Sequence, residues 1–432
     1  MSAAESIPKQ RIIWPLLALN FFMADMQAGI GPFLGVFLLA RHWHAGLIGT
    51  VMTLGGIAGM VMTAPMGALV DGSRHKRLLV IIPGIATLLA SSLILVSQNF
   101  WVIAASQIAS AVAGAAIGPA VIGITLGIVR QSGFMRQNGR NQAFNHAGNM
   151  VGAALSGYLG WVFGFPAVLA LAALFGLLSI ISVLLIPARA IDDRAARGLK
   201  GAAGSGEKAG GLRVLAQSRP LLLLAAALGM FHLGNGAMLP LYGMAVVASQ
   251  GGSGPLFVAE TIVIAQGVMI LAAIAAAKGA ERTSYWAVLL VSFAALPIRG
   301  LIASHAITHL GVYPVQMLDG VGAGLQSVAV PGLVARVLNG TGRVNLGQGA
   351  VMTVQGVGAA LSPAIGGWIA QEFGYAETFR ILGCFALGSI ALWLIFGRIV
   401  REGERLQAEG NPDPPTAAPP AGRAAPDPRA GR

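Results

Sequence analysis

Charged side chains are scarce in this chain. Asp, Glu, Lys and Arg make up only 10% of its 432 residues, against about 25% in an average soluble domain. Hydrophobic residues make up 55%, and the mean hydropathy is +0.73. A soluble globule cannot bury that much apolar surface. The composition therefore excludes a water-soluble enzyme, and it excludes disorder over the body of the chain.

Cysteine is nearly absent, because Cys384 is the only one in the sequence. A disulfide scaffold and a multi-cysteine metal site are therefore excluded. The sequence also lacks the Gly-x-Ser-x-Gly, His-Glu-x-x-His and Walker patterns of hydrolases, zinc proteases and ATP-driven pumps. We expect no enzyme, no cofactor and no bound metal.

The sequence contains instead a series of twelve apolar stretches, each close to the roughly 20 residues that a membrane-crossing helix needs. The first is not a cleavable signal peptide, because it is too long, contains Asp25 and lacks a small-residue cleavage site. We predict an all-α polytopic membrane protein with twelve transmembrane helices. The predicted spans are 12–38, 46–70, 78–98, 101–129, 142–164, 166–187, 220–247, 256–277, 285–304, 310–335, 347–370 and 378–399.

Basic residues gather on alternate loops. If the N-terminus is cytoplasmic, 25 of the 28 Lys and Arg residues lie on the cytoplasmic side, and only Arg41, Arg299 and Arg380 do not. Cytoplasmic loops carry such an excess in membrane proteins. Both chain ends are therefore predicted to be cytoplasmic, in a bacterial-type inner (plasma) membrane. The same distribution explains the net charge of +12, so we expect these charges to face a lipid bilayer and no nucleic acid.

The longest polar interruption, residues 188–218, divides the spans six and six. It predicts an N-terminal six-helix half at 1–187, a flexible cytoplasmic linker at 188–218 and a C-terminal six-helix half at 219–401. Residues 402–432, rich in Pro, Ala and Arg, are predicted to be a disordered cytoplasmic tail.

The two halves repeat each other. The pentapeptide Gly-Ala-Ala-Leu-Ser at 152–156 recurs at 358–362, which is 206 positions later. Several matches in one register favour a duplication over chance. The same offset matches Gly114 with Gly320, Gly118 with Gly324, Arg130 with Arg336 and Gln142 with Gln348. Two halves related by a pseudo-twofold axis are typical of a transporter that binds its substrate between them, near the middle of the membrane.

The loop after the second span carries a motif. Residues 67–77 read Gly-Ala-Leu-Val-Asp-Gly-Ser-Arg-His-Lys-Arg. This stretch resembles the loop 2–3 signature of the major facilitator superfamily (MFS), Gly-x-Leu-x-Asp-Arg-x-Gly-Arg-Arg/Lys. Residues that match are Gly67, Leu69, Asp71 and Lys76, and residues that depart are Gly72, Arg74 and His75. The resemblance extends over about residues 10–400 and implies the MFS fold, and we expect a monomer.

In that family the loop latches the cytoplasmic side shut when the transporter faces outward. The resemblance makes Gly67, Asp71 and Lys76 the gating residues. Gly67 is expected to let another backbone approach closely, and Asp71 to accept hydrogen bonds from a neighbouring helix or to pair with an arginine. The alternative is that the basic residues of the loop serve only to set the topology.

The fifth span contains a weaker match. Exporters of the family often carry Gly-x3-Gly-Pro-x2-Gly-Gly there, and this chain has Gly148, Gly152 and Gly157 but Ala153 in place of the proline. The match suggests the drug/metabolite:proton antiporter branch. Close packing of small residues is an equally good explanation.

Few ionisable residues lie inside the spans, where each costs at least about 2.5 kcal/mol and marks a candidate site. They are Asp25, His232, Glu260, Arg299 and Asp319. Arg299 and Asp319 lie on consecutive spans and are predicted to form an ion pair, either structural or broken by substrate. Glu260 is one turn from the outer end, where it can reach water.

Asp25 is our preferred proton carrier, because it is the only acid deep in the N-terminal half and its span lines the cavity in the MFS. At an offset of 208 residues, Gln27 corresponds to Asn235, and Asp25 lies one position from the equivalent of His232. We expect these four residues to form a polar cluster at the central site. The alternatives are a structural pair for Asp25 and a structural hydrogen bond for His232.

Several amides within the spans are candidates to line the substrate cavity or to bond a neighbouring helix: Gln266, Gln316 and Gln355. His146, near the inner end of the fifth span, is a weaker candidate. The function that fits best is secondary active transport by alternating access, with proton-coupled export of a small organic compound. An importer or uniporter is the alternative, and a channel or a polytopic enzyme fits less well. The deep acids favour a cationic substrate and Arg299 an anionic one, so both classes stay open.

Overall fold

The computed structural model describes residues 9–28, 31–196, 218–338 and 344–409 and leaves out some side chains within them, including those of Asp25, Gln27 and Asp71. The regular secondary structure in these ranges is helical, without a strand. The predicted all-α fold is confirmed. The elements are α1 (Lys9–Ala28), α2 (Gly31–Leu39), α3 (Ala45–Gly72), α4 (Leu78–Val96), α5 (Phe100–Gly114), α6 (Ile117–Phe163), α7 (Phe165–Leu184), η1 (Ala188–Ala190), α8 (Asp193–Ala196), α10 (Arg219–Asn235), α11 (Met238–Gln250), α12 (Gly254–Arg282), α13 (Tyr285–His305), α14 (Val312–Val337), α15 (Val344–Phe373), α16 (Tyr375–Ile395) and α17 (Gly397–Glu409).

These helices supply the twelve predicted spans. Ten segments of the described chain are by themselves long and apolar enough to cross a membrane. The first span is made by α1 and α2, and the fifth by the part of α6 that follows a kink at Arg130. The helix that carries the fifth span begins before residue 142, the predicted start of that span. Residues 131–141 are helical as well, because Gln137 and Asn141 are buried there and hydrogen-bond to each other at 2.9 Å.

Two spans of the described chain are broken into two helices, at the α5/α6 and α10/α11 junctions. Glycine and proline account for both breaks. Gly114 ends α5 and Pro119 follows in the first turn of α6, and Pro240 lies in the first turn of α11. Proline leaves a carbonyl without its helical donor, and such backbone is tolerated at membrane depth only where it is buried in protein or lines a cavity.

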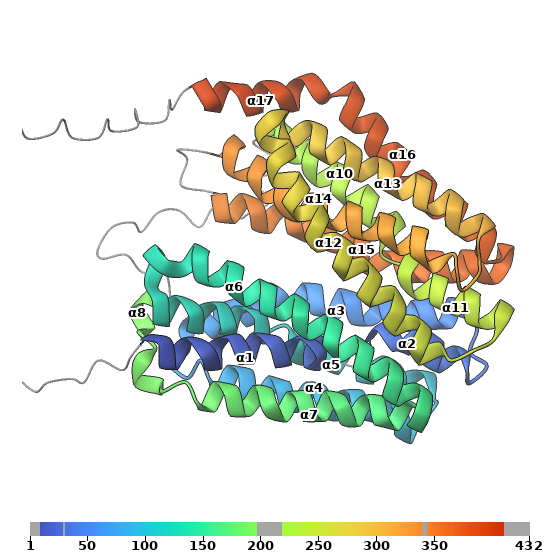
Figure 1. Ribbon diagram of the computed structural model, residues 1–432, viewed down its shortest axis with the longest axis horizontal. Coiled ribbons are helices and arrows are strands. Elements are labelled where there is room, and N and C mark those ends of the chain that lie inside the picture. The colour runs from blue at the N-terminus through green and yellow to red at the C-terminus, as the bar shows by residue number, and fades with distance from the viewer. Residues whose placement is uncertain (1–8, 29–30, 197–217, 339–343, 410–432) are drawn as a thin grey trace, which may run out of the picture.

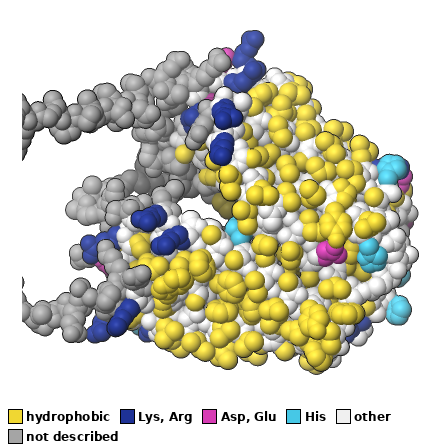
Figure 2. All heavy atoms as spheres, in the orientation of Figure 1, with side chains coloured by type: hydrophobic (Ala, Val, Ile, Leu, Met, Phe, Trp, Pro, Cys, Tyr) yellow, Lys and Arg dark blue, Asp and Glu magenta, His cyan; other side chains and the backbone are white. Residues whose placement is uncertain are grey.

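The helices form two bundles, α1–α8 and α10–α17, which lie one below the other in Figure 1. The bundles meet mainly where α3 packs against α15 and α6 against α12. We call the side where α1 begins and α17 ends the terminal face, and the side where α2 ends and α3 begins the distal face. Lys and Arg side chains gather at the terminal face, and hydrophobic side chains cover the belt between the faces (Figure 2).

The two bundles are in close contact near the distal face. Thr53 Oγ1 accepts a hydrogen bond from the Ala364 N–H at 2.9 Å, and so joins α3 to α15. A Cβ at Gly49 would lie 1.9 Å from the carbonyl oxygen of Pro363. Only glycine permits so close an approach of two helix backbones.

The bundles are apart at the terminal face. A Cβ added at Gly67, Gly72, Gly139 or Gly349 would meet no neighbouring heavy atom within 4 Å. Figure 2 shows a hollow between the halves on this side, with basic side chains on both rims. The expectation that Gly67 admits another backbone concerns the closed terminal face, and it stays a prediction.

The predicted linker is folded at its start. Residues 188–196 form η1 and α8, and the Asp192 N–H donates to the carbonyl oxygen of Gly127 at 3.0 Å. The Asp192 carboxylate also pairs with Arg130 at 3.4 Å. A flexible linker over the whole of 188–218 is therefore a wrong prediction. Residues 197–217 lie outside the described residues, and the limits of the two halves stay a prediction.

The predicted tail is also folded at its start. Residues 402–409 continue α17, although disorder was expected from 402 onward. Glu404 is buried, and it accepts hydrogen bonds from Arg336 at 2.9 Å and from the Tyr285 N–H at 3.0 Å. These bonds dock α17 on α13 and α14. Residues 410–432 lie outside the described residues.

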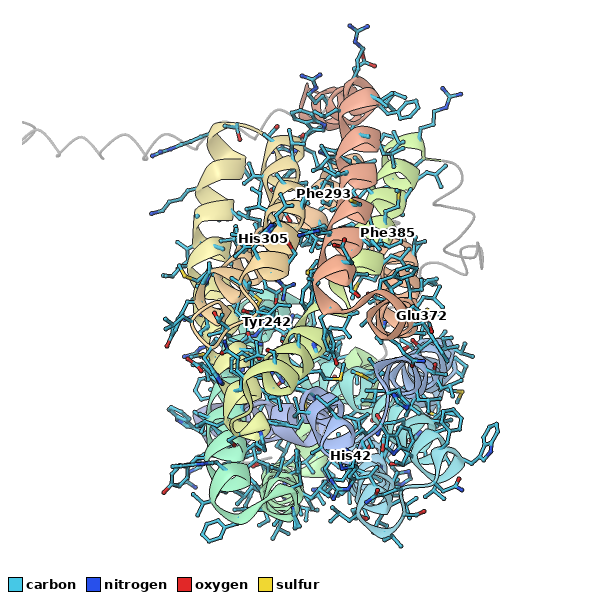
Figure 3. All side chains as sticks on the ribbon, turned by 90° about the vertical axis from the view of Figure 1, so that its right-hand side faces the viewer. His42, Tyr242, Phe293, His305, Glu372 and Phe385 are labelled. Atoms are coloured by element: carbon cyan, nitrogen blue, oxygen red, sulfur yellow. The ribbon has the colours of Figure 1, made fainter. Side chains whose placement is uncertain are left out.

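An aromatic core fills the C-terminal bundle. The ring of Phe293 lies 5.8 Å from that of Phe231 and 5.4 Å from that of Trp393. Figure 3, viewed from the distal face, places Phe293 inside this bundle. Tyr242 of α11 donates to the carbonyl oxygens of Ala306 and Thr308 at 2.5 and 3.1 Å, which ties α11 to the end of α13.

Candidate substrate and ion-coupling site

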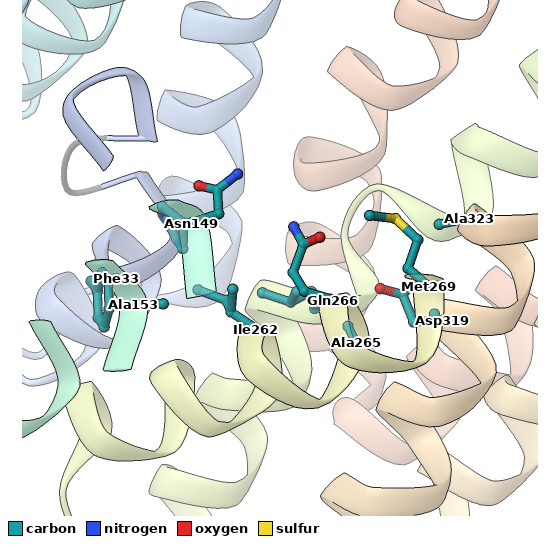
Figure 4. Close-up of a pocket in the computed structure, with 12 residues that line it drawn as sticks. Phe33, Asn149, Ala153, Ile262, Ala265, Gln266, Met269, Asp319 and Ala323 are labelled. Atoms are coloured by element: carbon teal, nitrogen blue, oxygen red, sulfur yellow. The ribbon is translucent and has the colours of Figure 1, made fainter. Parts of the chain in front are cut away.

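A cavity of about 320 Å³ lies between the two bundles. Pockets of this volume suit a small organic ligand. Figure 4 shows that α2 and α6 line one side and α12 and α14 the other. The N-terminal half contributes Pro32, Phe33, Asn149 and Ala153, and the C-terminal half contributes Leu239, Ile262, Ala265, Gln266, Met269, Asp319, Gly320 and Ala323.

Two glycines one turn apart bring α14 against α12. A Cβ at Gly320 would lie 2.5 Å from the carbonyl oxygen of Ala265, and a Cβ at Gly324 would lie 2.5 Å from that of Met269. The Gly-x3-Gly spacing permits this contact between membrane helices. It fixes Asp319, the neighbour of Gly320, at the wall of the cavity.

Asp319 belongs to a buried network of four polar side chains. Arg299 Nη1 donates to Asp319 Oδ1 at 2.7 Å and to Asn235 Oδ1 at 2.6 Å, and Nη2 donates to Gln316 Oε1 at 3.3 Å. The amide of Asn235 donates to Asp319 Oδ1 at 3.3 Å. The predicted ion pair between Arg299 and Asp319 is therefore present, and two neutral acceptors share the guanidinium with it.

The two partners of the ion pair differ in their access to the cavity. The side chain of Arg299 is 1% exposed, whereas that of Asp319 is 17% exposed and lines the cavity. Both bonds to the carboxylate reach Oδ1, and the described residues donate none to Oδ2. One carboxylate oxygen is therefore held by protein, and the other is available to a proton or to a donor group of a ligand.

The break between α10 and α11 positions Asn235. Asn235 ends α10, and the Ala237 N–H that the break leaves without a helical partner donates to Ser362 Oγ at 2.8 Å. A Cβ at Gly236 would lie 2.8 Å from the carbonyl oxygen of Ala359, so α15 crosses here in close contact. The repeated pentapeptide at 358–362 thus supports the broken helix whose last residue bonds to Arg299.

His232 and Gln355 form a separate pair. His232 Nδ1 lies 3.0 Å from the carbonyl oxygen of Leu228, and His232 Nε2 lies 3.0 Å from Gln355 Nε2. A carbonyl accepts and an amide nitrogen donates, so this network requires a neutral imidazole with its proton on Nδ1. His232 and Asn235 do not hydrogen-bond each other, since Asn235 bonds Arg299 instead, and the expected four-residue cluster stays a prediction. The side chains of Asp25 and Gln27 lie outside the described residues.

A polar contact crosses between the halves at the cavity. Gln266 Oε1 of α12 lies 3.1 Å from His146 Nδ1 of α6. Sequence reasoning ranked His146 low because it was placed near the end of its span, and it overlooked Asn149, which lines the cavity one turn further on.

Glu260 and Lys76 lie away from the cavity. Glu260 interacts electrostatically with Tyr313 in the distal part of the C-terminal half. Lys76 is buried, and its Nζ donates to the carbonyl oxygen of Val70 at 2.5 Å, near the end of α3. A cation that bonds the last carbonyls of a helix stabilises its C-terminus. The side chain of Asp71 lies outside the described residues.

The family model of the Major Facilitator Superfamily matches residues 16–345 and 300–428 of the chain. The chain belongs to the Major Facilitator Superfamily. An MFS-type transporter of Mycobacterium tuberculosis, found in strains CDC 1551 / Oshkosh and H37Rv, is 37% identical over 387 residues, which are 89% of this chain and 93% of the relative. This MFS protein is therefore a secondary transporter of a small-molecule substrate within a membrane, and it is not an enzyme.

Solved structures share its fold at low sequence identity. A variant of the nucleoside transporter NupG aligns over 90% of this chain and 99% of its own, with a TM-score of 0.72 and 14% identity. A bacterial homolog of the human lysosomal transporter Spinster, in an inward-facing and unoccupied conformation, aligns over 95% and 100%, with a TM-score of 0.69 and 13% identity. Both similarities concern the fold alone.

Proposed function

We propose that this MFS transporter exports a small organic compound in exchange for protons. One observation carries the proposal: a carboxylate oxygen of Asp319 faces a cavity between two halves that touch at one face and stand apart at the other. A carboxylate open to the cavity can bind a proton from whichever side the cavity faces. Alternating exposure of such a site to the two sides is the basis of secondary transport.

The orientation follows from the basic residues. With both chain ends cytoplasmic, the terminal face is the cytoplasmic face of the inner membrane, and the hollow in Figure 2 opens inward. The ion-paired Asp319 then represents the stage at which the proton has left and the compound enters from the cytoplasm. We assign the transporter as a monomer, because one chain supplies both halves of the cavity.

The hydrogen bonds around Arg299 allow its ion pair with Asp319 to break and form again. When Oδ2 of Asp319 binds a proton, the Coulomb attraction to Arg299 disappears, and a buried arginine without acceptors would be strongly unfavourable. Asn235 and Gln316 offer Arg299 two neutral acceptors at 2.6 and 3.3 Å. The guanidinium therefore stays hydrogen-bonded while Asp319 is neutral.

Proton binding and the change of conformation are linked through α14 and α12. Asp319 lies on α14, which packs closely on α12, and α12 contacts α6 of the other half. Protonation from the outside weakens the bond that holds α14 to α13 and favours the return to the inward-open state, in which the proton leaves. Before that return, Asp71 and Lys76 latch the closed terminal face, and the distal contact between Thr53 and Ala364 is open.

Asp25 is the second candidate carrier. It is the only acid deep in the N-terminal half, and an assay that separates the two carboxylates decides between them. Asp25→Asn and Asp319→Asn are each tested in proteoliposomes for accumulation driven by a pH gradient and for exchange without a gradient. The carrier is the residue whose neutralisation abolishes gradient-driven accumulation but leaves exchange largely intact.

The experiment is a flux assay with a panel of small organic compounds, with and without a pH gradient. Export coupled to protons predicts uptake into inside-out vesicles when their lumen is acidic. Glu377→Gln is the matched control, because Glu377 is exposed at the distal face and bonds only Arg380. Flux that does not depend on the pH gradient would establish a uniporter. Accumulation in the direction opposite to export would establish an importer.

A further inference from the structure

A second cavity of about 510 Å³ lies inside the N-terminal half, where α2, α3, α4 and α5 meet. It is next to the cavity between the halves. Gly31 and Leu34 line the second cavity, and the intervening Pro32 and Phe33 line the first, so the start of α2 separates the two.

The repeat-related glycines have different surroundings in the two halves. In the C-terminal half, Gly320 and Gly324 press α14 against α12. Their N-terminal equivalents face open space, because the one atom within 4 Å of a Cβ at Gly114 is Thr87 Oγ1 at 3.9 Å, and none lies within 4 Å at Gly118. The glycines that close the C-terminal half therefore leave room in the N-terminal half.

A buried hydroxyl in this cavity has no partner. Thr87 lines the cavity, is 4% exposed, and its Oγ1 makes no hydrogen bond with the described residues. Leaving such a group unsatisfied costs about 1–3 kcal/mol. A molecule that bonds Thr87 would recover this energy, so the hydroxyl points to an occupant with a polar atom.

The other polar groups of the cavity are neutral. Ser91 and Ser110 hydrogen-bond each other at 3.2 Å, and the amide of Gln107 makes no bond to the described residues. Among the lining residues that the structure describes, none is ionisable. An ion would lose its hydration there without gaining a counter-charge, whereas a hydroxyl or an amide would gain hydrogen bonds.

We propose that this cavity binds an uncharged, hydroxyl- or amide-bearing part of the transported compound. The identity of the occupant as the transported compound rests on the proposed function, but the preference of the cavity for neutral polar groups does not. In this arrangement the C-terminal half binds and releases the proton at Asp319. The N-terminal half recognises a group whose charge does not change with pH.

The test measures which chemical groups enter the cavity. Cys384→Ser removes the native thiol, and Ser110→Cys places a thiol in the second cavity. Three ethyl methanethiosulfonates of matched length then compete: one ends in a hydroxyl, one in a trimethylammonium and one in a sulfonate. The same thiolate attacks all three reagents. The ratio of two reagents' rates at this thiolate, divided by the ratio of their rates with free 2-mercaptoethanol, therefore reports access to the cavity and not thiol reactivity.

We expect the hydroxyl reagent to modify the Ser110→Cys thiol at least 10-fold faster than either charged reagent. Ala323→Cys is the matched control, since it places the thiol beside Asp319 in the first cavity, where the cationic reagent should be at least as fast as the hydroxyl reagent. Equal rates for all three reagents at Ser110→Cys would overturn the proposal. So would failure of all three there while the Ala323→Cys thiol reacts.

A second variant tests the unpartnered hydroxyl. Thr87→Val keeps the shape of the side chain and should reduce the advantage of the hydroxyl reagent at least threefold. Thr261→Val is the control, because Thr261 is also buried but its hydroxyl bonds its own helix at 2.6 Å. An unchanged ratio in Thr87→Val would overturn the role of this residue.

The proposed function and the proposed binding in the second cavity can be refuted independently of each other. The labelling experiment needs no transport, so it stands or falls whether or not protons drive flux. For a compound that passes the flux panel, Thr87→Val should raise KM about 5-fold and leave the response to the pH gradient unchanged. A lost response to pH with an unchanged KM would contradict the division between the halves.

Discussion

The two halves share a sequence repeat, but the repeated residues have different neighbours in each half. In the C-terminal half, the repeated glycines bring α12 and α14 into contact, and Phe293, Phe231 and Trp393 fill the interior. In the N-terminal half, the matching Gly114 borders a cavity with neutral polar walls. A glycine in a membrane helix therefore marks where space is required, and the neighbouring side chains decide whether a helix or a ligand occupies that space.

The halves also differ in buried charge. The C-terminal half holds Arg299 against Asp319, with one partner sealed and the other at the cavity wall. In the N-terminal half, Arg130 pairs with Asp192, and both side chains are exposed. The two halves thus differ in the burial of these ion pairs, and four predictions test that asymmetry.

Removal of Arg299 should have the largest effect. Arg299→Leu leaves the Asp319 carboxylate buried without a counter-charge, and we expect it to lower the free energy of unfolding by about 3 kcal/mol or more. Titration with SDS in mixed micelles measures the loss. The double variant Arg299→Leu/Asp319→Leu should recover more than half of it, and strictly additive effects would contradict a coupled pair. Arg380→Leu, which breaks an exposed pair with Glu377, is the control.

Gly49 should tolerate substitution far worse than Gly67. A Cβ at Gly49 overlaps the Pro363 carbonyl oxygen, so Gly49→Ala should cost about 1–3 kcal/mol and push the distal face apart. Gly67→Ala meets open space here and should be neutral for this conformation. Distances between spin labels across the distal face measure the shift. Equal behaviour of the two variants would contradict the conformation described.

Glu404 and Asp192 occupy comparable places in the two halves, since each pairs with one of the repeat-related arginines, Arg336 and Arg130. Glu404→Ala leaves the Tyr285 N–H and Arg336 without their acceptor and should cost about 1–3 kcal/mol. Asp192→Ala breaks a pair whose side chains are 40% and 74% exposed and should cost about 1 kcal/mol or less. Thermal unfolding in detergent ranks the two. A larger loss of stability in Asp192→Ala than in Glu404→Ala would show that solvent exposure does not determine the strength of these two ion pairs.

Asp71→Asn should change stability least, yet reduce flux several-fold. The carboxylate is proposed to act only when the terminal face closes, so its loss should not affect the conformation described here. Membrane insertion and the melting temperature should match the parent protein, while flux in proteoliposomes falls. Full flux would show that the loop motif has no gating role, and loss of the protein from the membrane would indicate a folding role.

Sequence reasoning located the helices better than the polar contacts. Apolar length and the Arg299–Asp319 spacing follow from chemistry along one or two neighbouring spans, and both predictions were correct. His232 and Asn235 lie three positions apart on α10, close enough for contact along the helix. They bond different partners, because Asn235 bonds Arg299 of α13 and His232 bonds Gln355 of α15, and the pattern along the sequence does not reveal those partners.

The sequence by itself determined the membrane environment, the number of spans, the repeat and the presence of a buried ion pair. Each depends on the cost of placing polar groups in hydrocarbon, which any bilayer imposes on the chain locally. Only the tertiary structure decided which glycines border a helix and which border a cavity, and which oxygen of Asp319 stays open. Those outcomes depend on contacts between residues far apart in the chain, such as Gly320 with Ala265 and Ser362 with Ala237, and no local pattern encodes them.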